Sequence, residues 1–431
     1  MSPRPPLPRL LRRLFTLLAA GLLLLLPAAR GAPSAADVIP VRVLLPAPFY
    51  DATVGALPDF RRSHPGLELE LVRGPLDTDT IADLAVGSLL LGEAPYDVLM
   101  VDITWTPLFA AAGWLAPLEP LVGEGVLEAM EPGARAGNAF DGHLWRLPFS
   151  GDTGLLYWRT DLMARPPRTT DELVRISRDL QRQGKVRWGY LWQGRQYEGL
   201  SCVMLEAIHA FGGRWWNPAT GRTELDQPAA INAAAWLDGL VQNGISPVAV
   251  AGFAENEALQ LFAAGEAAFL RNWPYAWKVI EQGGGPVVGH VGVAPVVVAP
   301  GQEAGGTLGT WGFALLRGSS HPREAAEAIR WLTGPELQRR LAVEQGYAPT
   351  WTALYEDPQL QKAAPLLAAQ RAALAAGPLL RPLTPFYAQL SDVLQRQING
   401  MITGQGAPAA AMAGAQQRSE AVIRAMTGAA A

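Results

Sequence analysis

Two aspartates occupy positions from which a carboxylate could bind hydroxyl groups. Asp102 ends an apolar segment, residues 98–101, and Asp152 lies in the Gly- and Ser-containing loop at residues 148–154. An ionised carboxylate only accepts hydrogen bonds and can take two hydroxyl donors at once, which suits the vicinal hydroxyls of a sugar. An Asp that follows a strand is also typical of a helix or turn cap, so both interpretations stay open here.

Aromatic and arginine side chains could complete such a site. The chain has 14 tryptophans, and several lie beside chain breakers or polar residues. Clustered in a cleft, Trp faces stack on the C–H faces of sugar rings, although any single Trp is more often a core residue. Arg381, just before Pro382, could donate to a hydroxyl or carboxylate ligand or simply lie on the surface.

The same carboxylates also allow a hydrolytic interpretation, because a glycosidase uses two of them around the scissile bond. Sequence alone does not give the separation of Asp102 and Asp152. Other chemistries lack their motifs: there is no Walker loop, no GxSxG motif and only one cysteine, Cys202. The five histidines are far apart and show no metal-ligand spacing, so we expect neither a metal nor another cofactor.

Composition bounds the class of protein. The 431 residues are 49% hydrophobic and 17% charged, which predicts one to three well-packed domains. The formal net charge is −4, and the only charged residues within residues 1–36 are arginines, so the remaining chain is more acidic still. An acidic body argues against nucleic-acid binding, which needs a basic surface.

The N-terminus has the pattern of an export signal. Arginines at residues 9–13 precede an apolar run, Leu14–Leu26, which is shorter than the roughly 20 residues of a membrane-spanning helix. Small residues follow at 27–32, so we predict a signal peptide at residues 1–31 and a periplasmic mature protein. An uncleaved membrane anchor is the alternative. The only cysteine lies deep in the chain, so the protein is not expected to be a lipoprotein.

The mature chain begins with alternating strands and helices, which predicts a parallel sheet in an α/β fold. Ligands of such sheets bind beyond the carboxyl ends of the strands, here at residues 46–51 and 102–105. The pattern predicts strands at 38–45, 67–72, 96–101 and 287–298, and helices at 52–63, 79–91, 170–183, 200–211, 228–243, 255–264, 321–333, 335–345, 360–376, 385–402 and 407–429.

Several segments together resemble one family. In order and spacing they are similar to family 1 extracellular solute-binding proteins of ABC importers, and above all to the trehalose/maltose-binding proteins and their glucosylglycerol-binding relatives. The segments that carry this resemblance are residues 60–66, 96–105, 112–118, 147–159, 189–200, 262–277, 309–312 and 381–382.

The resemblance implies a class II periplasmic-binding-protein-like fold, with two α/β lobes joined by hinge crossings and a ligand cleft between them. We expect residues 38–150 and about 310–345 in the N-terminal lobe, and residues 151–309 and about 346–431 in the C-terminal lobe. It implies a binding protein rather than an enzyme. A disaccharide or glucosylglycerol-type glycoside would be captured by hinge closure and delivered to the transmembrane subunits of an ABC permease.

The resemblance also implies roles for particular residues. By position, Asp102 and Asp152 would accept sugar hydroxyls, Trp273 and Tyr275 would flank the ring, Trp311 and Gly312 would supply stacking and a backbone contact, and Arg381 would donate to hydroxyls. Disaccharide-binding relatives carry a Glu in the loop after the first strand. Here Asp51 could replace it, or Phe49 or Tyr50 could fill its space, which leaves the exact sugar open.

Two alternatives remain at this point. One is a secreted glycoside-processing enzyme that uses Asp102 and Asp152. The other is a protein of the same fold that binds a different solute, such as a polyamine or a metal-loaded chelate. The many tryptophans and the lack of metal-ligand motifs argue against the latter.

Overall fold

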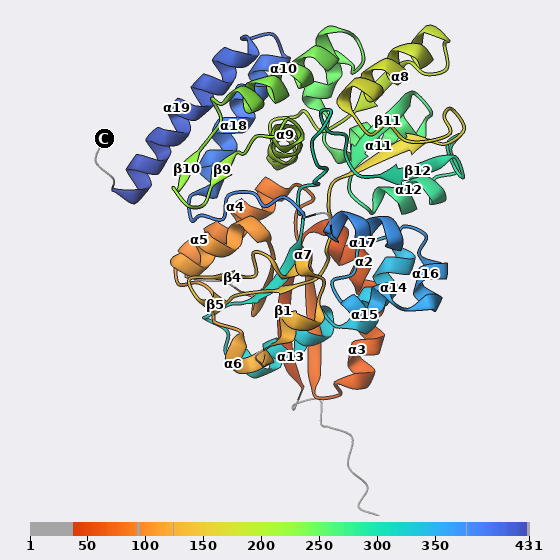
Figure 1. The fold of residues 1–431 in the computed structure, drawn as a ribbon. Helices are drawn as coiled ribbons and strands as arrows, with labels where there is room; N and C mark the ends of the chain where they lie inside the picture. The colour runs from red at the N-terminus through yellow and green to blue at the C-terminus, as the bar shows by residue number, and fades with distance from the viewer. Residues whose placement is uncertain (1–37, 93–94, 124, 376, 429–431) are drawn as a thin grey trace, which may run out of the picture.

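The computed structural model describes residues 38–92, 95–123, 125–375 and 377–428. The predicted signal peptide lies outside these residues. The described chain forms two α/β lobes, each built on a sheet of its own (Figure 1). This arrangement agrees with the predicted fold class.

The sheet of the first lobe combines early and late segments of the chain. Its strand order is β2-β1-β3-β13-β6. β1 pairs in parallel with β2 and β3, as the alternation of strands and helices predicted, and β13 runs antiparallel to β3. The strands are β1 (Ile39–Leu45), β2 (Leu67–Arg73), β3 (Val98–Asp102), β6 (Leu147–Pro148) and β13 (Trp311–Leu315).

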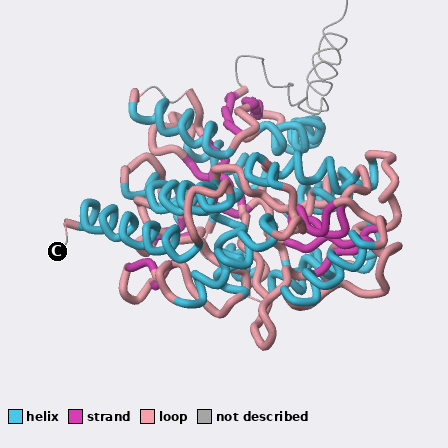
Figure 2. The backbone as a smooth tube through the Cα atoms, turned by 90° about the horizontal axis from the view of Figure 1, so that it is seen from above, coloured by secondary structure: helices cyan, strands magenta, loops and turns pink. Residues whose placement is uncertain are grey.

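Helices cover both faces of this sheet, which is why β3 is buried along its whole length. One face packs on α2, α3, α13 and α14 around Phe60 and Ile329, and the other packs on α4 and α5 around Ile81 and Phe109. Seen from above, the helices surround the strands (Figure 2). The helices are α2 (Ala47–Thr53), α3 (Leu57–Ser63), α4 (Thr78–Leu90), α5 (Thr106–Ala111), α13 (Pro322–Leu332) and α14 (Pro335–Glu344).

The second lobe has the strand order β12-β7-β11-β8. Its central helix is α9, whose residues are buried except for the half-buried Glu198 and His209, because α10, α18 and α19 pack around it. The elements are β7 (Leu155–Arg159), β8 (Trp188–Leu191), β11 (Ala267–Asn272), β12 (Val291–Ala294), α8 (Thr170–Arg182), α9 (Glu198–Ala210), α10 (Pro228–Gln242), α11 (Glu255–Ala263), α12 (Ala276–Gln282), α18 (Tyr387–Ile402) and α19 (Pro408–Thr427).

The chain passes between the lobes through residues 149–154, 295–310 and 377–386. These crossings lie side by side, because Thr153 forms a β-bridge with Leu308, and Thr307 forms one with Leu379. A few adjacent backbone segments at a domain boundary are the usual form of a hinge.

One stretch packs differently from the expected division of the chain. Residues from about 346 on were expected in the C-terminal lobe. Instead α15 (Thr352–Tyr355), α16 (Pro358–Ala363) and α17 (Leu367–Ala375) share a buried cluster with Ala342 of α14 in the first lobe. Apolar side chains of these short helices cover that end of α14. Ala373 of α17 also packs in a buried cluster of the second lobe, and α18 lies within that lobe (Figure 1).

Prolines explain two further differences from the expected elements. Residues 46–51 were expected as a turn, but α2 begins at Ala47, because Pro48 is compatible with the first turn of a helix. The helix expected over residues 360–376 is divided into α16 and α17 around Pro365, since proline interrupts a helix interior.

The remaining short elements are α6 (Glu119–Val122), α7 (Pro132–Arg135), β4 (Ala139–Phe140), β5 (His143–Leu144), β9 (Trp216–Asn217) and β10 (Arg222–Thr223).

Candidate functional site

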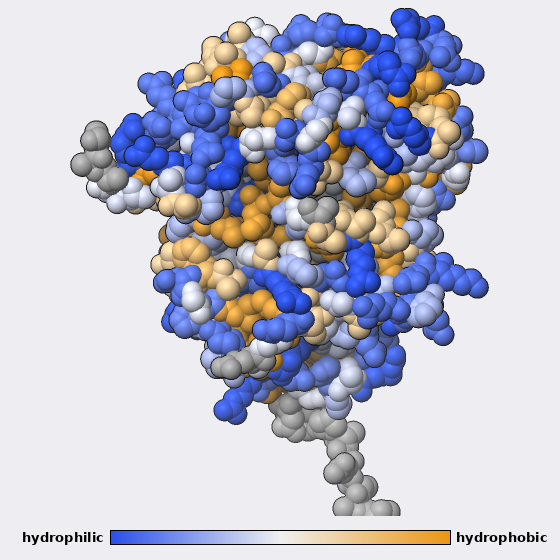
Figure 3. All heavy atoms as spheres, in the orientation of Figure 1, coloured by the Kyte–Doolittle hydropathy of each residue, from blue (hydrophilic) through white to orange (hydrophobic). Residues whose placement is uncertain are grey.

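A cavity of about 510 Å³ lies between the two lobes. Apolar side chains gather between the lobes on the face shown in Figure 3, whereas the outer ends are mostly polar. The first lobe contributes residues that follow β1, β2 and β3, and the second lobe contributes the starts of α9 and α11 and the segment after β11. The volume falls within the range of small-molecule binding sites.

The structure brings nearly all the predicted site residues to this cavity. Its wall includes Asp51, Asp102, Asp152, Trp273, Tyr275, Trp311 and Arg381. Gly312 does not line it. This glycine is buried in β13, where a Cβ atom would lie 2.5 Å from the carbonyl oxygen of Leu147, so it allows β6 and β13 to approach.

Asp102 is held in an ion pair at the end of β3. Its Oδ1 accepts hydrogen bonds from the backbone N–H and the hydroxyl of Thr104, at 2.9 and 2.7 Å. The Arg381 Nη2 lies 2.9 Å from Oδ1 and 3.0 Å from Oδ2. Asp102 therefore caps the turn after β3, one of the two roles considered from the sequence, and it also binds an arginine.

Arg381 extends this pair to the second lobe. Its Nη1 donates to Glu198 Oε1 at 2.6 Å, and Glu198 also accepts hydrogen bonds from the hydroxyls of Tyr387 and Ser391. Burial raises the pKa of Glu198, although Arg381 acts in the opposite direction. The Arg381 Nε is buried and has no hydrogen-bond partner among the described residues.

Asp152 has a different environment. It lies on the crossing between β6 and β7, and its Oδ1 accepts the backbone N–H of Ala348 at 2.9 Å. Among the described residues it forms no ion pair. Burial raises its pKa to about 7, because no cation offsets the loss of water around the carboxylate.

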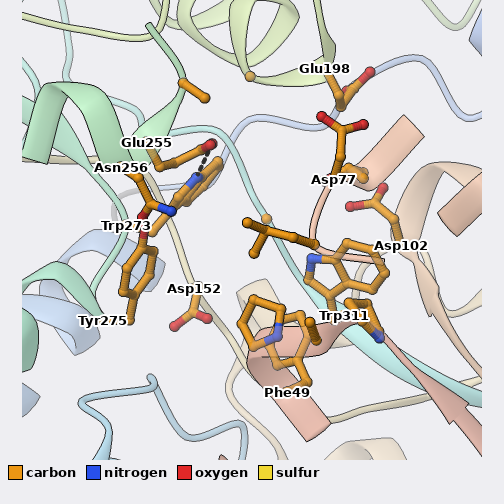
Figure 4. A pocket seen from close by; sticks show the side chains of 18 of the residues that line it. Phe49, Asp77, Asp102, Asp152, Glu198, Glu255, Asn256, Trp273, Tyr275 and Trp311 are labelled. Atoms are coloured by element: carbon orange, nitrogen blue, oxygen red, sulfur yellow. Dashed lines mark hydrogen bonds between the residues drawn. The ribbon is translucent and has the colours of Figure 1, made fainter. Parts of the chain in front are cut away.

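Aromatic side chains form two opposing walls. Trp273 and Tyr275, from the segment after β11, face Phe49 and Trp311 of the first lobe, and Asp152 lies between the two groups (Figure 4). The ring centroids of Phe49 and Trp311 are 5.4 Å apart. Trp273, Tyr275 and Trp311 are only half-buried, so part of each ring remains accessible to a ligand, whereas Phe49 is buried.

A buried ion pair supports the Trp273 wall. The Arg271 guanidinium lies 4.1 Å from the centroid of the Trp273 ring and binds Glu206 through two hydrogen bonds, at 2.9 and 2.6 Å. Glu206 in turn accepts the backbone N–H of Thr307 on a crossing segment. The orientation of the aromatic wall is therefore connected to the hinge through fixed hydrogen bonds.

Asp51 also lines the cavity, but its carboxylate is engaged at the rim. It binds Arg73 through two hydrogen bonds, at 2.9 and 2.8 Å, and the Arg73 guanidinium holds the pKa of Asp51 below its usual range. Phe49, the other candidate for the place of the missing Glu, lies deeper and is buried.

The sequence interpretation missed several polar residues of the cavity, among them Asp77, Arg195, Glu198 and Glu255. The rule that placed ligands beyond β1 and β3 would have found Asp77 and Arg195 if it had been applied to β2 and β8. Glu255 accepts the indole N–H of Trp273 at 3.1 Å, a contact for which the sequence offers no signal.

The described residues contain no group of His, Cys, Asp or Glu side chains that could hold a metal ion. Cys202 lines the back of the cavity, and burial raises its thiol pKa, so the thiol stays protonated. Within the described part of the chain, no helix combines the length and the apolar character that crossing a membrane requires.

Comparisons with known proteins agree with this geometry. The sequence model described as "Bacterial extracellular solute-binding protein" matches residues 45–339. A "Probable ABC transporter-binding protein" of Deinococcus radiodurans is 33% identical over 359 residues, which cover 80% of this chain and 84% of that protein. A "Maltotriose-binding protein" of Pyrococcus abyssi is 25% identical over 280 residues, 63% of this chain and 58% of that protein.

A solved structure shows the same architecture. Maltose-bound MalE3 of T. maritima aligns with a TM-score of 0.84 and 31% sequence identity, over 89% of this chain and 100% of that chain. The predicted two-lobed, class II fold is therefore confirmed. From the family match, the relative of Deinococcus radiodurans and the shared fold, we conclude that this chain belongs to the bacterial extracellular solute-binding proteins.

Proposed function

We propose that this protein is the sugar-binding component of an ABC importer and captures a disaccharide or a glucosylglycerol-type glycoside outside the cytoplasm. The observation that carries the proposal is the buried carboxylate of Asp152, which lies without a cation between two aromatic walls. A ring stacked between Trp273 and Trp311 would place its hydroxyl groups against this acceptor.

The other polar groups fit the same ligand. Among the described residues the Oδ2 of Asp102 accepts one hydrogen bond, from Arg381, so it retains acceptor capacity. A sugar hydroxyl can donate to this oxygen as well as to the carboxylate of Asp152. Names of similar proteins support this ligand class, since they include a maltotriose-binding protein and a maltose-bound structure.

Function follows from closure of the hinge. A ligand that contacts walls from both lobes binds the closed form more tightly than the open form, and this difference drives closure. The closed protein would then dock on the transmembrane subunits of its permease, and opening there would release the sugar.

Calorimetric titration of the chain from residue 32 on tests this proposal. Trehalose, maltose, sucrose and glucosylglycerol are titrated separately, and the solutions are then analysed for hydrolysis. We expect saturable binding of one of them, with no product. Micromolar affinity would correspond to about −8 kcal/mol.

Two outcomes would overturn the proposal. Absence of heat with all four glycosides would move the ligand outside this class. Hydrolysis that an Asp152→Asn variant abolishes would instead favour a glycoside-processing enzyme that uses Asp102 and Asp152.

A further inference from the structure

We propose that Asp77 and Arg195 form a gate at the rim of the cleft, which slows sugar release and disfavours ligands longer than two rings. This inference rests on the proposed sugar-binding function. Asp77 follows β2 in the first lobe, and Arg195 follows β8 in the second lobe. The Arg195 Nη2 lies 2.6 Å from Asp77 Oδ2, and both residues line the cavity.

Each partner of the gate is oriented by its own lobe. Asp77 is the N-cap of α4, and its Oδ1 accepts the backbone N–H groups of Asp79 and Thr80, which leaves Oδ2 directed at Arg195. The Arg195 guanidinium lies 4.4 Å from the centroid of the Tyr197 ring. Since both side chains are held by contacts within their lobes, they meet only when the lobes approach each other.

The gate differs from the other inter-lobe ion cluster of the described residues. Arg381 connects Asp102 and Glu198 at the hinge, and the Arg381 and Asp102 side chains are only 2% and 4% exposed. The Arg195 and Asp77 side chains are 40% and 34% exposed. A buried cluster is expensive to separate, whereas an exposed pair exchanges its partner for water at little cost. The rim pair can therefore open and close.

The position of the Asp77–Arg195 pair allows it to discriminate between sugar ligands of different length. Asp77 lies on the side of the cavity where Glu198 and Asp102 also lie (Figure 4), so the Asp77–Arg195 bond closes that end of the site. A ligand that fits between the aromatic walls leaves the bond intact. A longer chain that leaves the cavity at this end has to separate the two side chains.

The experiment uses three variants of the mature chain: Asp77→Asn, Arg195→Gln and the double variant. Asn is also a good N-cap, so the first variant removes the charge and preserves the start of α4. Maltose and maltotriose are the probes, with affinities from calorimetry and release rates from stopped-flow tryptophan fluorescence. Arg42→Gln serves as a matched control, because it breaks an exposed ion pair with Glu70 inside the first lobe.

We expect each single variant to release maltose about two- to fivefold faster, the range that an exposed ion pair permits. The ratio of maltotriose to maltose affinity should rise in the same variants. The double variant should match the single ones, because the two side chains act through one bond. Three results would each contradict the gate. They are unchanged release rates in the single variants, additive effects on the release rate in the double variant, and an equal effect of the control variant Arg42→Gln.

A measurement without ligand separates this inference from the proposed function. Spin labels at Glu128→Cys in the first lobe and Lys185→Cys in the second report the distance between the lobes, because the natural Cys202 is buried. We expect Asp77→Asn to shift the ligand-free distances toward larger values. A shift without binding of maltotriose or of any of the four glycosides tested above would contradict the proposed function alone. Sugar binding with identical distances and release rates would contradict the gate alone.

Discussion

Asp102 and Asp152 line the same cavity and differ in environment. Both are buried, with exposed fractions of 3% and 6%. Asp102 binds Arg381, which also binds Glu198, so its charge is balanced within the protein. Asp152 has a backbone N–H as its partner and no cation.

The difference shows how one protein prepares two carboxylates for different tasks. A buried ion pair fixes Asp102 at the junction of the lobes. Burial raises the pKa of Asp152 to about 7, since its hydrogen bonds only partly replace the water it loses, and it can accept further donors. We therefore expect Asp102 to matter more for stability and Asp152 to matter more for binding.

The largest effect should follow from breaking the balanced cluster. Arg381→Met removes the cation between Asp102 and Glu198 and leaves two buried carboxylates without their cation. We expect a loss of about 3–5 kcal/mol in the free energy of unfolding, measured by urea denaturation. Adding Asp102→Asn and Glu198→Gln should restore part of this loss. A change below about 1 kcal/mol would show that the cluster is not an energetic unit.

The second largest effect should be a loss of sugar affinity in a variant that still folds. Asp152→Ala removes a buried acceptor that has no cation partner among the described residues, so sugar affinity should weaken at least about tenfold. Thermal unfolding should change little, because the lost hydrogen bond from the Ala348 N–H is offset by the removal of a buried carboxyl group. Titration calorimetry and circular dichroism measure the two quantities. Unchanged affinity would contradict the assignment of Asp152.

The third effect is a dependence on pH that Asp152 alone should produce. A bound hydroxyl donor favours the ionised carboxylate, so sugar affinity should fall as the pH decreases below about 7, by up to about tenfold per unit. In the unliganded protein the raised pKa has the opposite effect on stability. The folded state holds the proton between about pH 4 and 7, so stability decreases as the pH rises through this range.

Asp152→Asn provides the control for this dependence. Both pH profiles should become flatter in this variant, because the titrating group is gone. Calorimetry at about pH 5.5 and 7.5 and urea denaturation over the same range test the assignment. A wild-type affinity that stays constant over this range would rule it out.

The smallest effect should come from Asp51, the exposed carboxylate at the rim. Its side chain is 56% exposed and already paired with Arg73. Solvent screens such a pair, so Asp51→Asn should change sugar affinity less than about threefold. A loss of tenfold or more in calorimetry would show that Asp51 does replace the Glu of the disaccharide-binding relatives.

Local sequence patterns predicted much of the architecture. The apolar run of β3, with helices on both sides along the chain, indicated a parallel sheet covered on two faces, and this is what β1, β2 and β3 form. Apolar periodicity is a local property, so it can be interpreted from one segment. The antiparallel addition of β13 and the packing of α15–α17 on the first lobe depend on distant contacts, and the local pattern gave no guide to them.

The ends of apolar strands predicted that residues 46–51 and 102–105 lie at the cleft, because positions beyond strand ends fall at one edge of a sheet. The order of many short segments identified the family. The partners of the charged groups became clear from the tertiary structure alone: Arg381 with Asp102 and Glu198, Arg195 with Asp77, and Asp152 with no cation among the described residues. Asp77 and Arg195 are 118 residues apart in the sequence, and Asp102 and Arg381 are 279 residues apart. Electrostatic balance depends on distance in space and on burial, which spacing along the chain does not specify.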